Sequence, residues 1–259
     1  MENIFDFCDR KISSRKTPYK AKRFWDPESG LASLLVEARH LREGHKTVPG
    51  KASDCVNRAN LGETAFQRAL YNHKGKQVLV GEDFRCEIQW ADIELPITFA
   101  GRKGGRSRRH SVDLIAYAEK FGHFLCELKY ARNENAPPAN GADYAIFEAL
   151  IYFGIVKENF VALDNYEVWR GQRLRFEWKD IAKGSRVLVL ANSSFWKKAK
   201  GEKTRIQRLC REIKQRCGVE VMLYETKDAV LQTRACAYPK KVEPTLGTIE
   251  ELVCIPAFG

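Results

Sequence analysis

Three charged residues interrupt two apolar stretches in the middle of the chain. Asp113 lies in SVDLIAYA, residues 111–118, whereas Glu127 and Lys129 lie in HFLCELKY, residues 123–130. Two carboxylates offer the hard oxygen ligands that Mg²⁺ or Mn²⁺ prefers, and the backbone carbonyl of Leu128 can add another. A lysine beside such a cation can orient the attacking water or lower its pKa. These residue types therefore predict metal-assisted cleavage of a phosphodiester.

The turn between the two stretches decides whether these side chains meet. Glu127 and Lys129 are two apart on a predicted strand, so they project from one face of the sheet. A three-residue loop over residues 120–122, with Gly122 in the left-handed conformation, places Asp113 opposite Lys129 and diagonal to Glu127 on that face. A two- or four-residue loop places Asp113 on the other face. The alternative interpretation is a half-exposed strand pair whose charges face solvent and pair across the strands.

A predicted helix before the strand pair carries another carboxylate. The segment NLGETAFQRALYN, residues 60–72, predicts a helix on which Glu63 shares one stripe with Phe66 and Leu70. Because that stripe faces the core, the Glu63 carboxylate is expected to point the same way. The alternative is that Glu63 only completes a capping box that Asn60 begins.

In this order, the residues resemble the motif of the PD-(D/E)xK nuclease superfamily. The resemblance rests on Asp113 in one strand, Glu127-Leu128-Lys129 in the next and Glu63 on the preceding helix, and it covers roughly residues 55–160. It implies an α/β, restriction-endonuclease-like fold, which is a mixed β-sheet flanked by helices. It also implies that Asp113 and Glu127 bind the metal, that Lys129 serves the water and that Glu63 completes the site. Val112 stands where many members have proline.

The helix after the strand pair extends the resemblance. The segment ADYAIFEALIYFGIV, residues 142–156, predicts a largely buried helix that contains Glu148 and Tyr152. Their spacing is similar to the Gln-x-x-x-Tyr element of the exonuclease-type branch, with Glu in place of Gln. The alternative is that both residues are polar groups of a buried helix with no part in a site.

The remaining segments predict one domain preceded by an arm. Residues 1–30 are basic, contain prolines and aromatic residues, and are expected to form an N-terminal arm that docks on the body or on nucleic acid. Residues 31–259 are expected to form a single nuclease-like domain, beginning with a helix over 31–42. Extended runs over residues 77–90 and 93–100 precede the central strand pair. A strand, a helix and a strand over residues 185–226 are expected to extend the sheet.

Composition indicates a polyanionic partner. The chain has 44 Lys and Arg against 33 Asp and Glu, a formal net charge of +11. The 8 cysteines are scattered and none has the Cys-x-x-Cys spacing of a zinc or redox site, which is typical of reduced thiols in a cytoplasmic protein. The sequence shows no signal-peptide pattern and no apolar segment of membrane-spanning length, so no membrane partner is expected.

Two basic segments support nucleic acid as the partner. The first is GRKGGRSRRH, residues 101–110, a Gly-rich loop that leads into the Asp113 strand. Its candidate phosphate-binding residues are Arg102, Lys103, Arg106, Arg108 and Arg109. A plain surface loop is the alternative. The second is WKKAKGEKTRIQRLCREIKQR, residues 196–216, whose helix has an apolar stripe and a cationic outer face that fits either nucleic-acid binding or solubility alone.

Together these observations predict a Mg²⁺- or Mn²⁺-dependent nuclease that hydrolyses nucleic-acid phosphodiester bonds, and the family resemblance by itself favours DNA over RNA as the substrate. Endonuclease and exonuclease activity both fit. The alternatives are a binding or assembly subunit of the same fold with impaired catalysis, and an RNA-directed nuclease. A homodimer, or a partner subunit that supplies specificity, is also compatible with the sequence.

Overall fold

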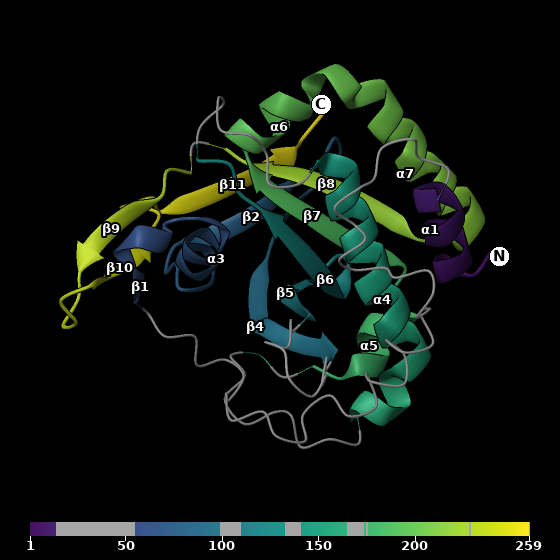
Figure 1. Ribbon diagram of the computed structural model, residues 1–259, viewed down its shortest axis with the longest axis horizontal. Coiled ribbons are helices and arrows are strands. Elements are labelled where there is room, and N and C mark those ends of the chain that lie inside the picture. The colour runs from purple at the N-terminus through teal and green to yellow at the C-terminus, as the bar shows by residue number, and fades with distance from the viewer. Residues whose placement is uncertain are drawn as a thin grey trace.

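A computed structural model describes residues 1–13, 55–98, 110–132, 141–164, 174, 176–227 and 229–258. These residues form a mixed α/β structure in which one large β-sheet is flanked by helices (Figure 1). The mixed sheet with flanking helices that the sequence predicts is therefore confirmed.

The large sheet has eight strands within the described residues, in the order β3-β2-β11-β8-β7-β6-β5-β4. The strands are β2 Lys76–Val80, β3 Arg85–Glu87, β4 Gln89–Thr98, β5 His110–Ala118, β6 Gly122–Lys129, β7 Arg186–Asn192, β8 Glu220–Thr226 and β11 Glu251–Pro256. β6, β7 and β8 run parallel to one another, as do β11 and β2, whereas the other neighbours are antiparallel. A smaller sheet contains β1 Val56–Asn57, β10 Lys241–Thr245 and β9 Gln232–Ala235, in that order.

The helices lie between these strands in the chain. They are α1 Ile4–Ser13, α3 Glu63–Tyr71, α4 Ala142–Asp164, α5 Trp178–Lys183, α6 Ser193–Ala199 and α7 Lys203–Cys217, with short 3-10 turns η2 Arg58–Asn60 and η3 Lys200–Glu202. α1, α4, α5 and α7 contribute to the apolar layer on one face of the large sheet, and α3 contributes to the layer on the other face. None of the helices in the described ranges is both long and apolar enough to cross a membrane.

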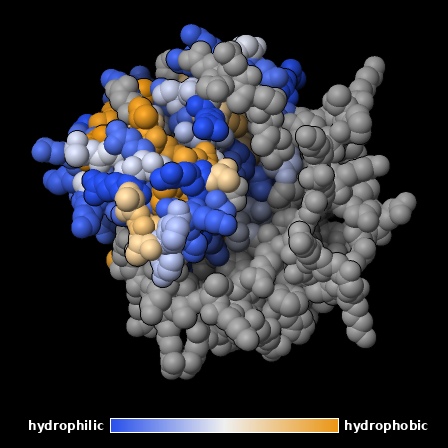
Figure 2. All heavy atoms as spheres, turned by 60° about the vertical axis from the view of Figure 1, so that its left-hand side comes forward, coloured by the Kyte–Doolittle hydropathy of each residue, from blue (hydrophilic) through white to orange (hydrophobic). Residues whose placement is uncertain are grey.

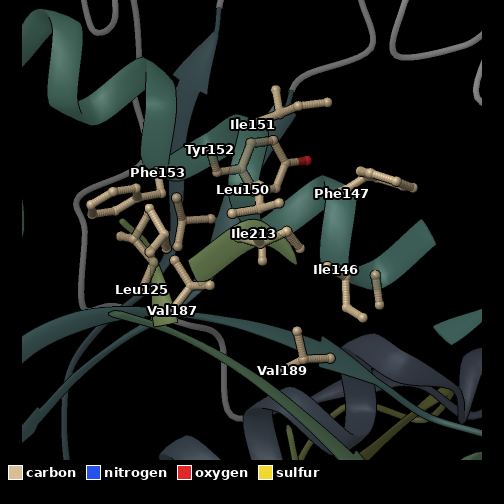
Figure 3. Close-up of a cluster of buried hydrophobic side chains, with 14 of the residues drawn as sticks. Leu125, Ile146, Phe147, Leu150, Ile151, Tyr152, Phe153, Val187, Val189 and Ile213 are labelled. Atoms are coloured by element: carbon tan, nitrogen blue, oxygen red, sulfur yellow. The ribbon is translucent and has the colours of Figure 1, made fainter. Parts of the chain in front are cut away.

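The centre of the large sheet is covered on both faces. Every residue of β7 from Val187 to Asn192 is buried, and a continuous apolar run of this kind is typical of a parallel strand between two layers. Figure 3 shows Leu125 of β6 with Val187 and Val189 of β7 close to the apolar side chains of α4 and to Ile213 of α7. This layer packs against β6 from one side.

The first helix packs against α4 at a glycine. Phe5 and Phe7 of α1 are buried in the same core as α4. A Cβ added at Gly154 of α4 would lie 2.8 Å from the Phe5 ring, so a glycine here lets the two helices approach closely. The predicted N-terminal arm therefore begins with a docked helix over residues 4–13. Residues 14–30 of that arm, and the predicted helix over 31–42, lie outside the described residues.

Most other predicted elements are found. The helix expected over residues 60–72 is α3, the buried helix over 142–156 is the first part of α4, and the strand–helix–strand unit over 185–226 is β7, α7 and β8. The single extended run expected over residues 77–90 is instead divided among β2, β3 and the start of β4. The chain turns after β2, and β3 pairs with β2 to form an antiparallel hairpin.

Candidate active site

The candidate site lies where β5 separates from β6. Their pairing runs from Ala118 opposite Gly122 to Leu114 opposite Cys126 and stops there. Beyond this point, Asp113 Oδ2 accepts a hydrogen bond of 2.8 Å from the backbone N–H of Leu128. The Asp113 carboxylate thus accepts a backbone hydrogen bond at a position where the two strands no longer pair. Because the N–H and C=O of one strand residue point toward the same edge, the Leu128 carbonyl faces the same opening.

The hairpin loop differs from the expected one by one residue. Its length is three residues, as predicted, but it comprises residues 119–121 because Gly122 already pairs with Ala118. The N–H of Phe121 donates to the Ala118 carbonyl at 2.9 Å, and Gly122 follows with φ of +72°. Gly122, in the left-handed conformation, therefore ends the turn and is also the first residue of β6. The shift moves the strand register by two residues, so Asp113 adjoins Glu127 and Leu128 rather than standing opposite Lys129.

Lys129 is surrounded by carboxylates from three elements. Its Nζ lies 2.5 Å from Glu127 Oε1 on β6, 3.0 Å from Glu148 Oε2 on α4 and 3.6 Å from Glu63 Oε1 on α3. Glu127 and Lys129 are only 3% and 5% exposed, whereas the Glu63 side chain is 42% exposed. The cluster is therefore buried at its base and open to solvent at Glu63.

Two further polar residues support the cluster. Gln67 Nε2 on α3 donates to the Asp113 carbonyl oxygen at 2.7 Å and lies 3.4 Å from Asp113 Oδ1. The Tyr152 hydroxyl on α4 donates to Glu148 Oε1 at 3.2 Å. Sequence reasoning missed Gln67. Its signal was its position one helical turn after Glu63, which puts the two residues on the same face of α3.

Several acidic side chains lie close together in the site, and burial and their mutual charges shift their pKa values. The pKa of Asp113 is raised from 3.8 to about 7, chiefly by burial and also by the neighbouring Glu63 charge, against the attraction of Lys129. Burial also raises the pKa of Glu127 well above its ordinary value, and the charges of Asp113 and Glu148 add to this effect. Burial alone would lower the pKa of Lys129, but the surrounding carboxylates raise it well above its ordinary value. One ammonium does not neutralise this many acids, so the site favours an additional cation or proton.

The donor set matches a cation that takes few protein ligands. Glu127 Oε2 is buried and accepts no hydrogen bond from another described residue, and the Glu127 carboxyl lies close enough to Glu148 for the two to share a proton. Asp113, Glu127 and the Leu128 carbonyl are hard oxygen donors, which Mg²⁺ uses in small number while it keeps several waters. No group of three or more His, Cys, Asp or Glu side chains within the described ranges is arranged to hold a metal ion. An ion bound by Asp113, Glu127 and the Leu128 carbonyl would therefore keep several waters.

The sequence-predicted residues separate into two sets. The structure brings together Asp113, Glu127, Lys129, Glu63, Glu148 and Tyr152. The basic loop residues Arg102, Lys103, Arg106, Arg108 and Arg109 lie outside the described residues.

Comparisons with known proteins add no relative: no family model, no curated protein and no solved structure matches this chain.

Proposed function

We propose that the protein is a metal-dependent nuclease that hydrolyses phosphodiester bonds, with DNA as the preferred substrate and a restriction-endonuclease-like fold. The observation that carries the proposal is the arrangement at the β5–β6 separation. Asp113 binds the backbone of Leu128 there, and Lys129 lies 2.5 Å from the Glu127 carboxylate. Acid, acid and lysine converge from two adjacent strands, in the order of the motif that the sequence resembles.

The acidic residues would hold a divalent cation. Asp113, Glu127 and the Leu128 carbonyl are the proposed ligands, and Glu63 assists from the open side of the cluster. A bound Mg²⁺ or Mn²⁺ polarises the phosphate and stabilises negative charge on it. The buried Glu127 Oε2, which accepts no hydrogen bond from another described residue, supports this assignment.

Lys129 would act as a hydrogen-bond donor. Its pKa is raised by Glu127, Glu148, Glu63 and Asp113, so the ammonium stays protonated at neutral pH. A protonated lysine can orient the attacking water and hold a phosphate oxygen, but it cannot remove a proton. Glu148, held by Tyr152, positions the ammonium from α4. Gln67 positions Asp113 from α3.

The charge of the whole chain supports a polyanionic substrate. A net charge of +11 raises the local concentration of nucleic acid and accelerates its association. The open position of Glu63 at the rim of the cluster leaves an approach for a phosphate group.

A cleavage assay tests the proposal. The purified protein is incubated with circular DNA, linear DNA and structured RNA in Mg²⁺, in Mn²⁺ or in EDTA, beside Asp113→Ala and Lys129→Ala. The exposed Lys183→Ala on α5 is the matched control, since it removes a lysine outside the cluster. We expect metal-dependent cleavage of DNA that falls by a factor of about 10² or more in both site variants and stays unchanged in the control.

Nicked circles would identify an endonuclease, and shortening only from ends would identify an exonuclease. Tight, salt-sensitive binding without cleavage in any metal would overturn the proposal and favour a binding or assembly subunit instead.

A further inference from the structure

The small sheet projects from the molecule beside the candidate site. Figure 1 shows β9 and β10 extending away from the large sheet, next to α3. We call residues 232–245, which comprise β9, its turn and β10, the basic ribbon. All four residues of β9 are exposed, so both faces of this strand meet solvent. A two-stranded ribbon of this kind is marginal in water unless its base is packed.

One face of β10, beginning at its turn end, is packed on a helix of the candidate site. Val242 of β10 forms a small apolar cluster with Val56 of β1 and Ala65 of α3. Ala65 is two residues after Glu63, whose carboxylate lies 3.6 Å from Lys129 Nζ. The ribbon is therefore anchored on the first turn of α3, the helix that also carries Glu63.

Cations dominate the free part of the basic ribbon. Arg234, Lys240 and Lys241 are exposed, and exposed Arg58 lies beside them because its N–H donates to the Lys240 carbonyl at 3.1 Å. None of these four cations forms an ion pair with another described residue, although Arg234 stands opposite Glu243 in the ladder. Figure 2, which brings this side of the molecule forward, shows hydrophilic side chains together with hydrophobic patches on its described part.

The outer face of α7 provides a contrast. Arg205 is paired with Asp143 and Glu202, Lys214 with Glu220, and Arg216 with Glu2 and Glu212. A cation that is already paired gains less from a phosphate, because it must give up its partner. Arg208 and Arg211 of α7 are also exposed without an ion pair to another described residue, so this contrast applies to Arg205, Lys214 and Arg216 and not to the whole helix.

The tip of the basic ribbon is rigid and aromatic. The N–H of Lys241 donates to the Tyr238 carbonyl at 3.0 Å, which closes a turn with Pro239 at its second position. Proline fixes the backbone there in advance of binding. Tyr238 is 60% exposed, and Lys241 Nζ lies 5.0 Å from its ring centre. A large exposed ring between cations suits contact with sugars and base edges as well as phosphates.

We propose that the basic ribbon enters the major groove of double-stranded DNA and positions the duplex at the candidate site. The turn over residues 236–240 lies beyond the last pair of β1 with β10, and it is the part that enters the groove, which is about 8.5 Å deep and 12 Å wide and admits a two-stranded ribbon. The major groove of an RNA duplex is too deep and narrow for side chains to read, so the ribbon selects DNA. This inference rests on the proposed nuclease function for the meaning of the neighbouring site.

Binding measured in EDTA tests the ribbon separately from cleavage. The probe is a labelled DNA duplex, compared with the matching single strand and RNA duplex, over a series of salt concentrations. The ribbon variant is Arg234→Ala/Lys240→Ala/Lys241→Ala. The control, Arg208→Ala/Arg211→Ala/Lys214→Ala on α7, removes the same formal charge from exposed positions.

We expect the ribbon variant to bind the DNA duplex roughly 10- to 100-fold more weakly at about 0.1 M salt, with the salt slope reduced by about 2–3. The α7 control keeps near wild-type affinity. The charge-preserving variant Arg234→Lys/Lys240→Arg/Lys241→Arg also keeps most of it, which separates loss of charge from loss of fold.

Unchanged duplex binding by the ribbon variant would overturn the inference, as would equal losses in both triple variants, no duplex binding by the wild type, or equal affinity for the RNA duplex. The proposed nuclease function fails by a different result, namely no metal-dependent cleavage by the wild type, while ribbon-dependent binding in EDTA would still be measured.

Discussion

At the scale of single residues, the candidate site combines groups that folding alone would not favour. Glu127 and Lys129 are almost fully buried, and burying charged groups costs free energy unless they are well paired. Lys129 is paired, but Glu127 Oε2 accepts no hydrogen bond from another described residue. Such a local cost is typical of sites whose charges serve binding or catalysis.

The raised pKa of Asp113 predicts how stability depends on pH. Its pKa is about 7 in the folded protein and near 3.8 when unfolded, so the folded state holds the proton more tightly. Without metal, this carboxyl therefore makes stability fall as pH rises from about 4 to about 7. Asp113→Asn carries no charge at any pH. We expect its Tm in EDTA at about pH 8 to exceed that of the wild type by several degrees.

Thermal unfolding in EDTA at pH 5 and at pH 8 checks this prediction. The exposed Asp83→Asn is the control, and its Tm should follow the wild type at both values. If Asp113→Asn loses as much stability as the wild type between the two values, the Asp113 carboxyl is not the group responsible.

At the scale of elements, the hairpin between β5 and β6 decides which charges become neighbours. The loop contains residues 119–121, and Gly122 occupies the left-handed region as the first residue of β6. A loop of different parity would turn Asp113 to the other face of the sheet. α3 and α4 then close the cluster from two sides by supplying Glu63 and Glu148 to Lys129.

The strain of a side chain at Gly122 gives a test of this hairpin. An added Cβ would meet no atom within 4 Å, so Gly122→Ala introduces only the cost of a left-handed alanine. That cost is about 1 kcal/mol in the free energy of unfolding. Gly201→Ala is a matched control, because its Cβ also meets nothing within 4 Å and its φ is not in the left-handed region.

Urea unfolding of the two variants measures the difference. Gly201→Ala should stay close to the wild type. Equal stability of the two variants would contradict the assignment of Gly122 as the residue that closes the turn.

At the scale of the whole molecule, one sheet joins segments that are far apart in the chain. β11, residues 251–256, pairs with β2, residues 76–80, and with β8. The Glu2 N–H donates to the Arg216 carbonyl at 2.8 Å, which ties the first residues to the end of α7. Contacts of such long range favour a single cooperative unit within residues 55–258 rather than separable halves.

A substitution in β11 tests that cooperativity. Leu252 of β11 is fully buried, and β11 lies between β2 and β8 in the sheet. Leu252→Ala should therefore lower the free energy of unfolding by about 2–5 kcal/mol. The exposed Glu250→Ala is the control. We expect one transition with the same midpoint by tryptophan fluorescence and far-UV circular dichroism. Two transitions, of which Leu252→Ala moves only one, would show separate units.

Local patterns were sufficient for much of the fold. The apolar runs SVDLIAYA and HFLCELKY predicted β5 and β6, and the apolar stripe of residues 202–218 predicted α7. The docking of the first helix on α4 was not predicted, because nothing in MENIFDFCDRKIS states that Gly154 leaves room for Phe5. The hairpin register was missed by two residues, because one glycine can either belong to the loop or begin the strand.

The sequence by itself determined the types of residue at the candidate site, their order along the chain and the strong positive charge. These follow from composition and from periodicities that act over a few residues. Only the tertiary structure decided that Gln67 holds Asp113, that Glu63, Glu127 and Glu148 share one ammonium, and that the basic ribbon stands on α3. The physical reason is that these contacts join residues distant in the chain, and their geometry depends on how helices and strands pack rather than on any local pattern.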